Sequence, residues 1–305
     1  MSFRQLLIAK SCHLSVEHNS IKIVQEDHEN FIPLEDVSII LIESKESTFT
    51  SSFFTSCAKH SIPVMLCGEN HIPSSLSISI NTHYRPYHVL MLQINQTLDN
   101  QVYICESLLK YKLKNQLSVL KLISASDQSI ELFDGYIEEI IGKDEINREG
   151  TAAKVFFNQL YGNGYVRFAE DPINIRQNYG YSVLAACLSR YFSLYGFNLA
   201  LGINHCGKTN AMNLVYDFIE PFRPLVDYYL FDSLEYLTDK INVQSKKELV
   251  NLLNARVLVD KKLVTVQYAM ELLVKSYLRY LEGESKYLDL PTIQLIDFDK
   301  LNESV

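Results

Sequence analysis

The spacing of apolar residues differs between the two ends of the chain. Up to about residue 80, short apolar runs alternate with polar residues, as in LLIAK, HLSVE, SIKIVQ, VSIILIES and IPVMLCG. Runs of this length predict β-strands. Between the last two runs, TSSFFTSCAKH begins with hydroxyl residues and continues with apolar residues at helical spacing, which predicts one short helix packed on the strands.

From INTHYRPYHVL onward, apolar residues recur at helical spacing over long segments. The expected helices are LMLQINQTLDNQVYICESLLKYKLKNQLSVLKLI, SIELFDGYIEEIIG, NREGTAAKVFFNQLYG, NIRQNYGYSVLAACLSRYFSLYG, KTNAMNLVYDFI and TVQYAMELLVKSYLRYLEG. We therefore predict an α+β protein of two domains. Residues 1–82 would form a β-rich, β-sandwich-like domain, and residues 83–305 would form a larger all-α domain.

The composition is that of a folded globular protein, with 47% hydrophobic and 21% charged residues. The formal net charge of -8 opposes long-range attraction to nucleic acid or to an anionic membrane. It does not exclude a nuclease, because metal-binding carboxylates add negative charge while a few local lysines contact phosphate. Composition alone therefore leaves the class of partner open.

Cysteine usage and apolar segments indicate a protein of the cytoplasm with no membrane partner. The six cysteines form no C-x-x-C pair, so neither a zinc cluster nor a disulfide framework is indicated. The N-terminus has no long apolar core, and the most apolar long segment, YSVLAACLSRYFSLYGFNLALGI, is interrupted by Arg190. We therefore expect a soluble cytoplasmic protein.

Residues 202–209, GINHCGKT, match the spacing of a nucleotide-binding P-loop. In such a loop, Gly207 would let the backbone approach the phosphates, and Lys208 and Thr209 would contact phosphate and Mg²⁺. The flanking segments NLALGI and RVLVD can be taken as the strands that this motif requires. A P-loop ATPase is therefore an alternative prediction, although the alternating strands of a parallel sheet are missing and the loop contains bulky residues.

The same stretch carries His205, Asp217 and Glu220, which suit a metal ion better. On a helical projection, Asp217 and Glu220 share a narrow polar stripe with Asn210 and Asn213, on a helix that is otherwise apolar. A solvated helix edge explains the stripe equally simply. However, two acids near the negative end of a helix dipole raise each other's energy unless a cation is present.

Glu149 is a second candidate carboxylate, in the segment NREGTAAKVFFNQL. Asn147 can cap this helix, and a glutamate in the first turn is favoured by the helix dipole, so Glu149 needs no further explanation at that level. Projection, however, places Glu149 on the apolar face of the helix beside small alanines. A buried carboxylate must be protonated, paired or bound to a metal. One imidazole with two or three carboxylates suits Mg²⁺ or Mn²⁺.

Four blocks in this order, NREGTAAKVFF, EDPINIRQNYGYSVL, LGINHCG and LVYDFIEPFRPLVD, resemble the CRISPR-associated integrase and endonuclease that captures new spacers, the Cas-one family. The match spans residues 147–227 and is most similar to the form found in type II CRISPR systems. The resemblance implies that Glu149, His205 and Glu220 are the catalytic metal ligands, with Asp217 as a possible additional acidic residue. Many relatives have Asp at the last position, so the longer Glu220 leaves the exact ligand set open.

The resemblance also implies an activity and partners. The protein would be a homodimer, joined through its N-terminal domain, that assembles with a small companion acquisition protein into a larger complex. With Mg²⁺ or Mn²⁺ it would insert foreign duplex DNA fragments into the CRISPR array at the repeat and leader, in antiviral immunity. The reaction would be a transesterification by a 3′-hydroxyl, with hydrolysis by the same site seen as nuclease activity. The P-loop match would then be a coincidence of spacing.

The expected DNA contacts are basic residues near the site in the sequence, namely Arg148, Lys154, Arg167, Arg176, Lys208 and Arg223. The run containing Lys110, Lys112, Lys114 and Lys121 is a further candidate, although such a run is more often a solvated helix face. Tyr165, Tyr179 and Tyr181 can either stack on bases or belong to the core. A third hypothesis is a DNA-binding scaffold without catalysis, in which the acids only decorate helices.

Overall fold

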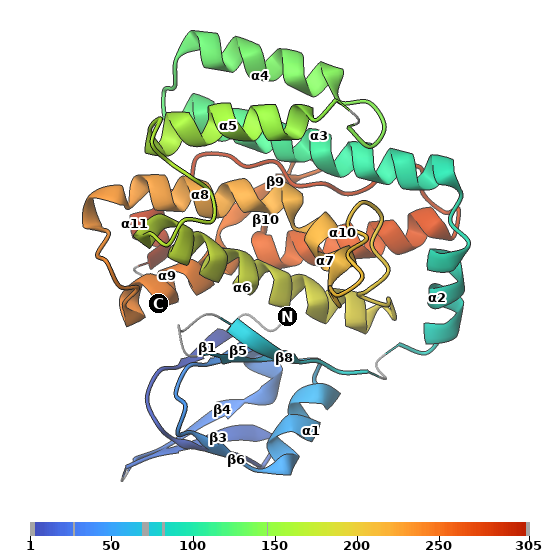
Figure 1. The fold of residues 1–305 in the computed structure, drawn as a ribbon. Helices are drawn as coiled ribbons and strands as arrows, with labels where there is room; N and C mark the ends of the chain where they lie inside the picture. Colours follow the sequence, from blue (N-terminus) through green and yellow to red (C-terminus); the bar gives the residue numbers. More distant parts are fainter. Residues whose placement is uncertain (1–3, 27, 69–72, 81–82, 145, 303–305) are drawn as a thin grey trace.

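Strands come first along the chain and helices follow, so the predicted α+β class is confirmed (Figure 1). The computed structural model describes residues 4–26, 28–68, 73–80, 83–144 and 146–302. In Figure 1 the N-terminal strands and α1 lie below, and the other helices lie above them together with β9 and β10, with α4 and α5 far from the N-terminal sheets. No helix among these residues combines the length and apolar composition needed to cross a bilayer.

Two four-stranded sheets form the N-terminal part. One has the order β1-β5-β7-β8, from Arg4–Ile8, Val37–Ile42, Val64–Cys67 and Pro73–Ser77. The other has the order β4-β3-β2-β6, from His28–Pro33, Ser20–Gln25, His13–Glu17 and Thr48–Phe49. The helix α1, Ser51–Lys59, begins at Thr50, whose side chain accepts a hydrogen bond from the backbone of Phe53. These elements enclose a small apolar core.

The central strand β5 joins this small core to the large one. All six of its residues, VSIILI, are buried, as expected of a parallel strand covered on both faces. Alternate side chains of a strand point to opposite faces. Ile40 and Ile42 accordingly enter the core of the N-terminal part, whereas Ile39 and Leu41 belong to the core of the helices. One face of this sheet therefore packs against the helical part, and the other face packs inside the N-terminal part.

In residues 83–144 and 146–302, helices predominate and one hairpin is present. The helices are α2 (Pro86–Ile94), α3 (Leu98–Leu122), α4 (Asp127–Glu139), α5 (Arg148–Tyr161), α6 (Pro172–Leu194), α7 (Asn213–Phe218), α8 (Arg223–Asp232), α9 (Val243–Asn251), α10 (Val266–Leu281) and α11 (Phe298–Asn302). The 3₁₀ turns are η1 (Leu34–Asp36), η2 (Glu220–Phe222), η3 (Leu234–Tyr236) and η4 (Leu252–Asn254). The hairpin pairs β9 (Arg256–Val259) with β10 (Lys262–Thr265).

The helix α6 is the centre of the helical part and packs against α8, α9 and α10. Most of its residues are buried, and Gly180 permits its closest approach to α8. A Cβ at position 180 would lie 2.7 Å from Cγ1 of Val226, closer than packed atoms allow. We infer that a glycine is needed there for α8, which follows the candidate site, to lie flat on α6.

Two predicted helices have different bounds in the structure. The segment expected as one long helix is broken into α2 and α3, because Thr97 caps α3 by accepting a hydrogen bond from the backbone of Asn100. The helix expected from Lys208 begins only at Asn213, and the residues before it form turns. The sequence patterns also did not reveal β4, β6, β8, the β9–β10 hairpin, α8, α9 or α11. The predicted domain boundary stays a prediction, since residues 81 and 82 lie outside the described residues.

Polar groups buried between the sheet and the helices fix their relative position. The carboxylate of Glu43, directly after β5, lies 2.7 Å from Nζ of Lys246 on α9, and both side chains are almost fully buried. The hydroxyl of Tyr179 on α6 donates to the same carboxylate at 3.3 Å. On the neighbouring strand β1, Gln5 exchanges two amide hydrogen bonds of 3.0 and 2.9 Å with Asn254 of η4. The helical part therefore has one docked orientation on the sheet.

Replacing Lys246 by Met should destabilise the protein by about 3–5 kcal/mol, because it leaves the carboxylate of Glu43 buried without its counter-charge. Urea unfolding measures this loss. The double replacement Glu43→Leu with Lys246→Met should recover much of it, since no unpaired charge remains. As a control, Lys22→Met removes two ion pairs with partly exposed partners, Glu17 and Glu29, and should shift the unfolding midpoint far less. An unchanged midpoint in Lys246→Met would contradict this account of the junction.

Candidate active site

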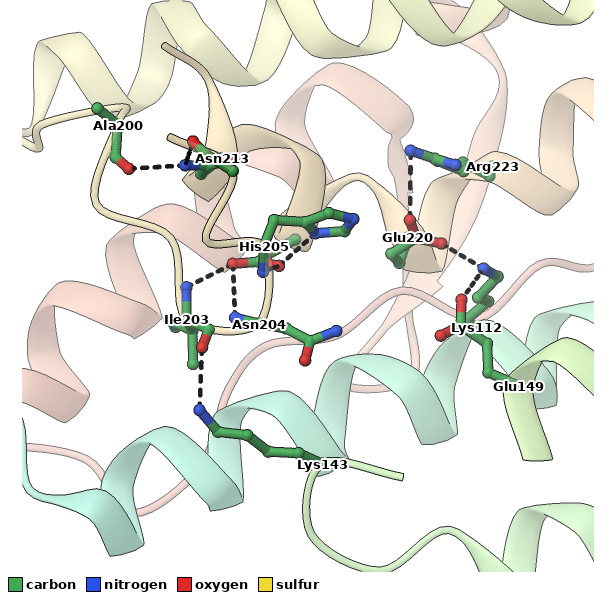
Figure 2. A network of polar contacts seen from close by, with 12 residues as sticks. Lys112, Lys143, Glu149, Ala200, Ile203, Asn204, His205, Asn213, Glu220 and Arg223 are labelled. Carbon is green, nitrogen blue, oxygen red and sulfur yellow. Dashed lines mark hydrogen bonds and ion pairs between the residues drawn. The ribbon is translucent and has the colours of Figure 1, made fainter. Parts of the chain in front are cut away.

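One pocket in the helical part gathers the predicted site residues from separate segments. It lies between α3, the start of α5 and the segment from residue 203 to η2 (Figure 2). Glu149, His205, Asp217 and Glu220 line it together with apolar residues of α3. The structure therefore places all four predicted acidic and imidazole side chains around one cavity.

Asp217 on α7 anchors the loop that carries the histidine. Its buried carboxylate accepts backbone N–H groups from Ile203 at 2.6 Å, Asn204 at 3.1 Å and His205 at 2.9 Å. The loop therefore wraps around one negative charge, as successive backbone N–H groups do around an anion. Asn213, also on α7, ties the next part of the loop by donating to the carbonyl oxygens of Ala200 and Gly207. The short helix α7 thus holds the loop at two points.

The same carboxylate orients the imidazole. Oδ1 of Asp217 lies 2.6 Å from Nδ1 of His205, so we assign the proton to Nδ1 and the lone pair of the neutral ring to Nε2. This hydrogen bond raises the pKa of His205 above its ordinary value, in spite of the opposing effect of partial burial. A carboxylate behind one ring nitrogen is the usual means of fixing an imidazole whose other nitrogen binds a metal.

Glu149 lies in the first turn of α5, but other side chains cap that helix. Asp144 accepts the backbone N–H groups of Arg148 at 2.8 Å and of Glu149 at 2.7 Å, and Asn147 accepts that of Gly150 at 3.3 Å. The carboxylate of Glu149 is therefore not required for capping. Its Oε1 lies 2.5 Å from Nζ of Lys112 on α3, on the side of the pocket.

Glu220 begins the turn η2 and carries the most buried carboxylate of the pocket after Asp217. Its Oε2 lies 2.5 Å from Nζ of Lys112, and its Oε1 lies 3.3 Å from Nη2 of Arg223. Burial alone would raise the pKa of Glu220, but the positive charges of Arg223 and Lys112 outweigh burial and lower it. The carboxylate of Glu220 therefore stays ionised beside the ammonium of Lys112 and the guanidinium of Arg223.

Lys112 itself stays charged in the interior. Burial disfavours an ammonium, but the charges of Glu220 and Glu149 outweigh this effect and raise the pKa of Lys112. The sequence prediction placed Lys112 among possible DNA contacts on a solvated face, and the structure instead places it on the buried face of α3, near Leu108 and Leu109. The sequence did indicate that Lys112 lies on the buried face, because Lys112 follows these leucines at helical spacing.

The donor set fits Mg²⁺ or Mn²⁺, although the side chains do not form a closed ligand set. Carboxylate oxygens from Glu149 and Glu220 and the Nε2 of His205 face one pocket, which is the hard oxygen-rich set these ions prefer. Oε2 of Glu220 is buried and has no directed hydrogen bond, only the nearby ammonium. In the described part of the chain, no three His, Cys, Asp or Glu residues are arranged to hold a metal ion. Ligation therefore requires Lys112 to move.

The predicted DNA contacts have different environments. Arg223 pairs with Glu220 at the pocket, and Arg148 forms an ion pair with Glu139. Arg167 donates to Asn174 and Asn178 at 2.7 and 2.8 Å. Lys154 and Lys208 are exposed.

Some of the predicted contacts lie in the interior instead. Arg176 is only 1% exposed and donates to Pro172, Thr238 and Lys240, so it supports the fold and does not reach DNA. The hydroxyl of Tyr179 bonds Glu43, and that of Tyr181 donates to Asp227 at 2.6 Å, so both rings belong to the core. Tyr165, which is partly buried, donates to Asn174 and Gln177. These positions therefore offer no stacking platform in this conformation.

The geometry of residues 202–209 differs from that of a P-loop. No strand lies directly before the loop, in the segment NLALGI, and the next helix, α7, begins only at Asn213. The segment RVLVD belongs to an antiparallel hairpin. Three backbone N–H groups of this loop, those of Ile203, Asn204 and His205, are already donated to Asp217. A bound phosphate would have to displace an internal carboxylate, so the loop is built to hold His205.

The α+β fold thus brings one imidazole and three carboxylates from separate segments to one pocket of its helical part. The family model for the CRISPR associated protein Cas1 matches residues 6–250, so the chain belongs to the Cas1 family. It is 28% identical over 296 residues to the CRISPR-associated endonuclease Cas1 of Neisseria meningitidis serogroup C (strain 8013), covering 96% of this chain and 97% of that protein.

Solved structures share the fold. A casposase bound to its integration product has a TM-score of 0.78 and 18% identity, covering 94% of this chain and 93% of that one. A CAS1 protein from Thermotoga maritima has a TM-score of 0.76 and 16% identity, covering 92% of this chain and 98% of that one. The β-rich part followed by a helical part is therefore the fold of this family.

Replacing Asp217 by Asn should lower the pKa of His205 and loosen its loop. Because the pKa of His205 is raised in the folded protein, its ion pair with Asp217 stabilises the fold fully below the ordinary histidine pKa. That contribution is lost as the pH rises through the raised value. NMR titration of the imidazole measures the pKa, and hydrogen exchange of residues 203–205 measures the loosening. Asp232→Asn, an exposed change on α8, is the control. Equal pKa values in the parent and Asp217→Asn would contradict the assignment.

Proposed function

We propose that this Cas1-family chain is a divalent-metal-dependent DNA integrase and endonuclease that inserts DNA fragments into a CRISPR array. Glu149, His205 and Glu220 would hold one Mg²⁺ or Mn²⁺ through two carboxylates and Nε2 of the imidazole. The observation that carries the proposal is the anchoring of His205. Asp217 uses three backbone hydrogen bonds and one imidazole contact to aim that ring at the pocket of Glu149 and Glu220.

The four side chains have separate tasks in this proposal. Glu149 and Glu220 supply negative oxygens from two elements, and His205 supplies a neutral nitrogen whose orientation Asp217 fixes. Asp217 is a positioning residue, because its oxygens are already engaged by the loop. A bound divalent cation supplies a Lewis acid that stabilises charge on the attacking and leaving oxygens.

The substrate in this proposal is DNA, and the reaction is a transesterification. The 3′-hydroxyl of an incoming fragment attacks a phosphodiester at the repeat, a new ester bond forms, and the old 3′ oxygen leaves. Attack by water at the same site would give endonuclease activity. Arg223 beside Glu220 and the exposed Lys208 on the histidine loop place positive charge near the pocket, which would position phosphates. The overall negative charge of the chain then matters less than these local groups.

Partners follow from the names of similar structures. One structural neighbour is a complex of Cas6-RT-Cas1 with Cas2, and the casposase neighbour holds an integration product. By analogy, the chain would act as a homodimer with a small companion acquisition protein, in the cytoplasm where invading DNA is found. The dimer would use the N-terminal sheets.

Glu149→Gln, His205→Ala and Glu220→Gln should each reduce joining of a short duplex to a repeat-bearing plasmid by about 10²-fold or more, since the bound cation is worth several kcal/mol of transition-state stabilisation. The assay uses the chain with its companion and Mn²⁺, and measures covalent product on a denaturing gel. Glu138→Gln, an exposed change on α4, is the matched control and should join normally. Near-normal joining by any of the three variants would remove that residue from the ligand set.

The P-loop alternative makes an opposite prediction. Because its backbone donors are engaged by Asp217, the loop should not bind ATP. At a constant Mg²⁺ concentration, adding ATP should leave the melting temperature of the parent and of Lys208→Ala unchanged. A nucleotide-dependent stabilisation that Lys208→Ala abolishes would restore the ATPase hypothesis. A scaffold without catalysis would instead bind DNA equally with chelator or Mn²⁺ and join none.

A further inference from the structure

Lys112 bridges two of the three carboxylates of the pocket, those of Glu149 and Glu220. Its Nζ lies 2.5 Å from Oε1 of Glu149 and 2.5 Å from Oε2 of Glu220. The two glutamates come from different elements, α5 and η2, and Lys112 from a third, α3. Figure 2 shows the ammonium between the carboxylates, on the side of the pocket opposite to Ile203. One flexible side chain therefore draws three segments of the site together.

The other charges around this bridge are already engaged. Arg223 takes the remaining oxygen of Glu220, and the imidazole of His205 is held by Asp217. Without Lys112, the buried Glu220 would keep only Arg223, and the partly exposed Glu149 would lose its counter-charge. The ammonium is therefore the one positive charge that the two glutamates share among the described residues.

The ammonium also lies where a shared cation would have to bind. A metal ion coordinated by Glu149 and Glu220 must lie between their oxygens, and Nζ of Lys112 is within 2.5 Å of one oxygen of each. Lysine suits a temporary occupant, because it is a compact point charge on a four-carbon stem with several rotatable bonds. A metal ion and the ammonium cannot occupy this position together, since both are positive.

We propose that Lys112 is a built-in counter-ion of the metal site, which holds Glu149 and Glu220 in place before a divalent cation binds and is expelled when it binds. This inference rests on the proposed function. Lys112 is a positioning residue in it, and it sets how tightly the cation is held. The ammonium keeps the pocket assembled without metal, and in return the cation must displace two ion pairs.

The test is Lys112→Met, which keeps the length of the stem and removes the charge. Mn²⁺ binding to the full chain is measured by EPR of free Mn²⁺, and melting temperature is measured in EDTA and in saturating Mn²⁺. We expect Lys112→Met to bind Mn²⁺ about tenfold more tightly or better, because no competing charge is present. We also expect it to melt lower than the parent in EDTA, with that deficit reduced by Mn²⁺.

Three further variants control the experiment. Lys110→Met removes a lysine of the same helix that pairs with Glu106 at 2.6 Å outside the pocket, and it should bind Mn²⁺ as the parent does. Lys112→Arg keeps the charge and should keep the weaker affinity. Lys112→Gln keeps polar contacts without the charge, and it replaces Lys112→Met if that variant does not fold in EDTA.

Equal or weaker Mn²⁺ binding by the folded uncharged variants would overturn the counter-ion role. If the parent still binds Mn²⁺ through Glu149, His205 and Glu220, the proposed function stands and only this inference falls. If neither the parent nor any variant binds Mn²⁺, both fall together. Mn²⁺ binding seen only in the uncharged variants would support the inference, since it shows that the ammonium competes.

Discussion

The site depends on how the carboxylates around its pocket are neutralised. Three of them, at Asp217, Glu220 and Glu149, lie around one pocket, and each has a different partner: the histidine loop, Arg223 with Lys112, and Lys112 alone. Moving such a charge from water into the interior is costly unless a partner is positioned for it. The partners therefore fix the geometry, because each ion pair or hydrogen bond ties one segment of the chain to another.

The two acids that follow the histidine loop divide the work between them. The sequence spacing of Asp217 and Glu220 suggested that both lie on one stripe of one helix. In the structure α7 ends at Phe218, and Glu220 begins the 3₁₀ turn η2, in which Pro221 is accommodated near the start. Asp217 consequently faces back to its own loop, whereas Glu220 faces α3 and α5. The change of direction between α7 and η2 explains why Asp217 orients the imidazole, whereas Glu220 shares the ammonium of Lys112 with Glu149. In the proposed site, Asp217 therefore acts as a positioning residue for the imidazole.

Local sequence patterns predict much of the architecture. The strands around VSIILI and the capped start of α5 at Asn147 follow from periodicity and capping, which depend on nearby residues only. The Thr97 cap was present in the sequence but was hidden inside a long periodic segment. The bridge of Lys112 depends on contacts between residues 37 and 108 positions apart, for which a single sequence gives no measure. The same holds for Arg176, whose burial comes from the segment near residue 240.

The central claim is that Glu149, His205 and Glu220 share one divalent cation. The most direct measurement is anomalous diffraction from crystals of the protein grown with Mn²⁺. The account predicts one strong anomalous peak bonded to a carboxylate oxygen of each glutamate and to Nε2 of His205, with Nζ of Lys112 moved away. A peak bonded elsewhere, or none while Nζ of Lys112 remains between the two carboxylates at saturating Mn²⁺, would contradict it.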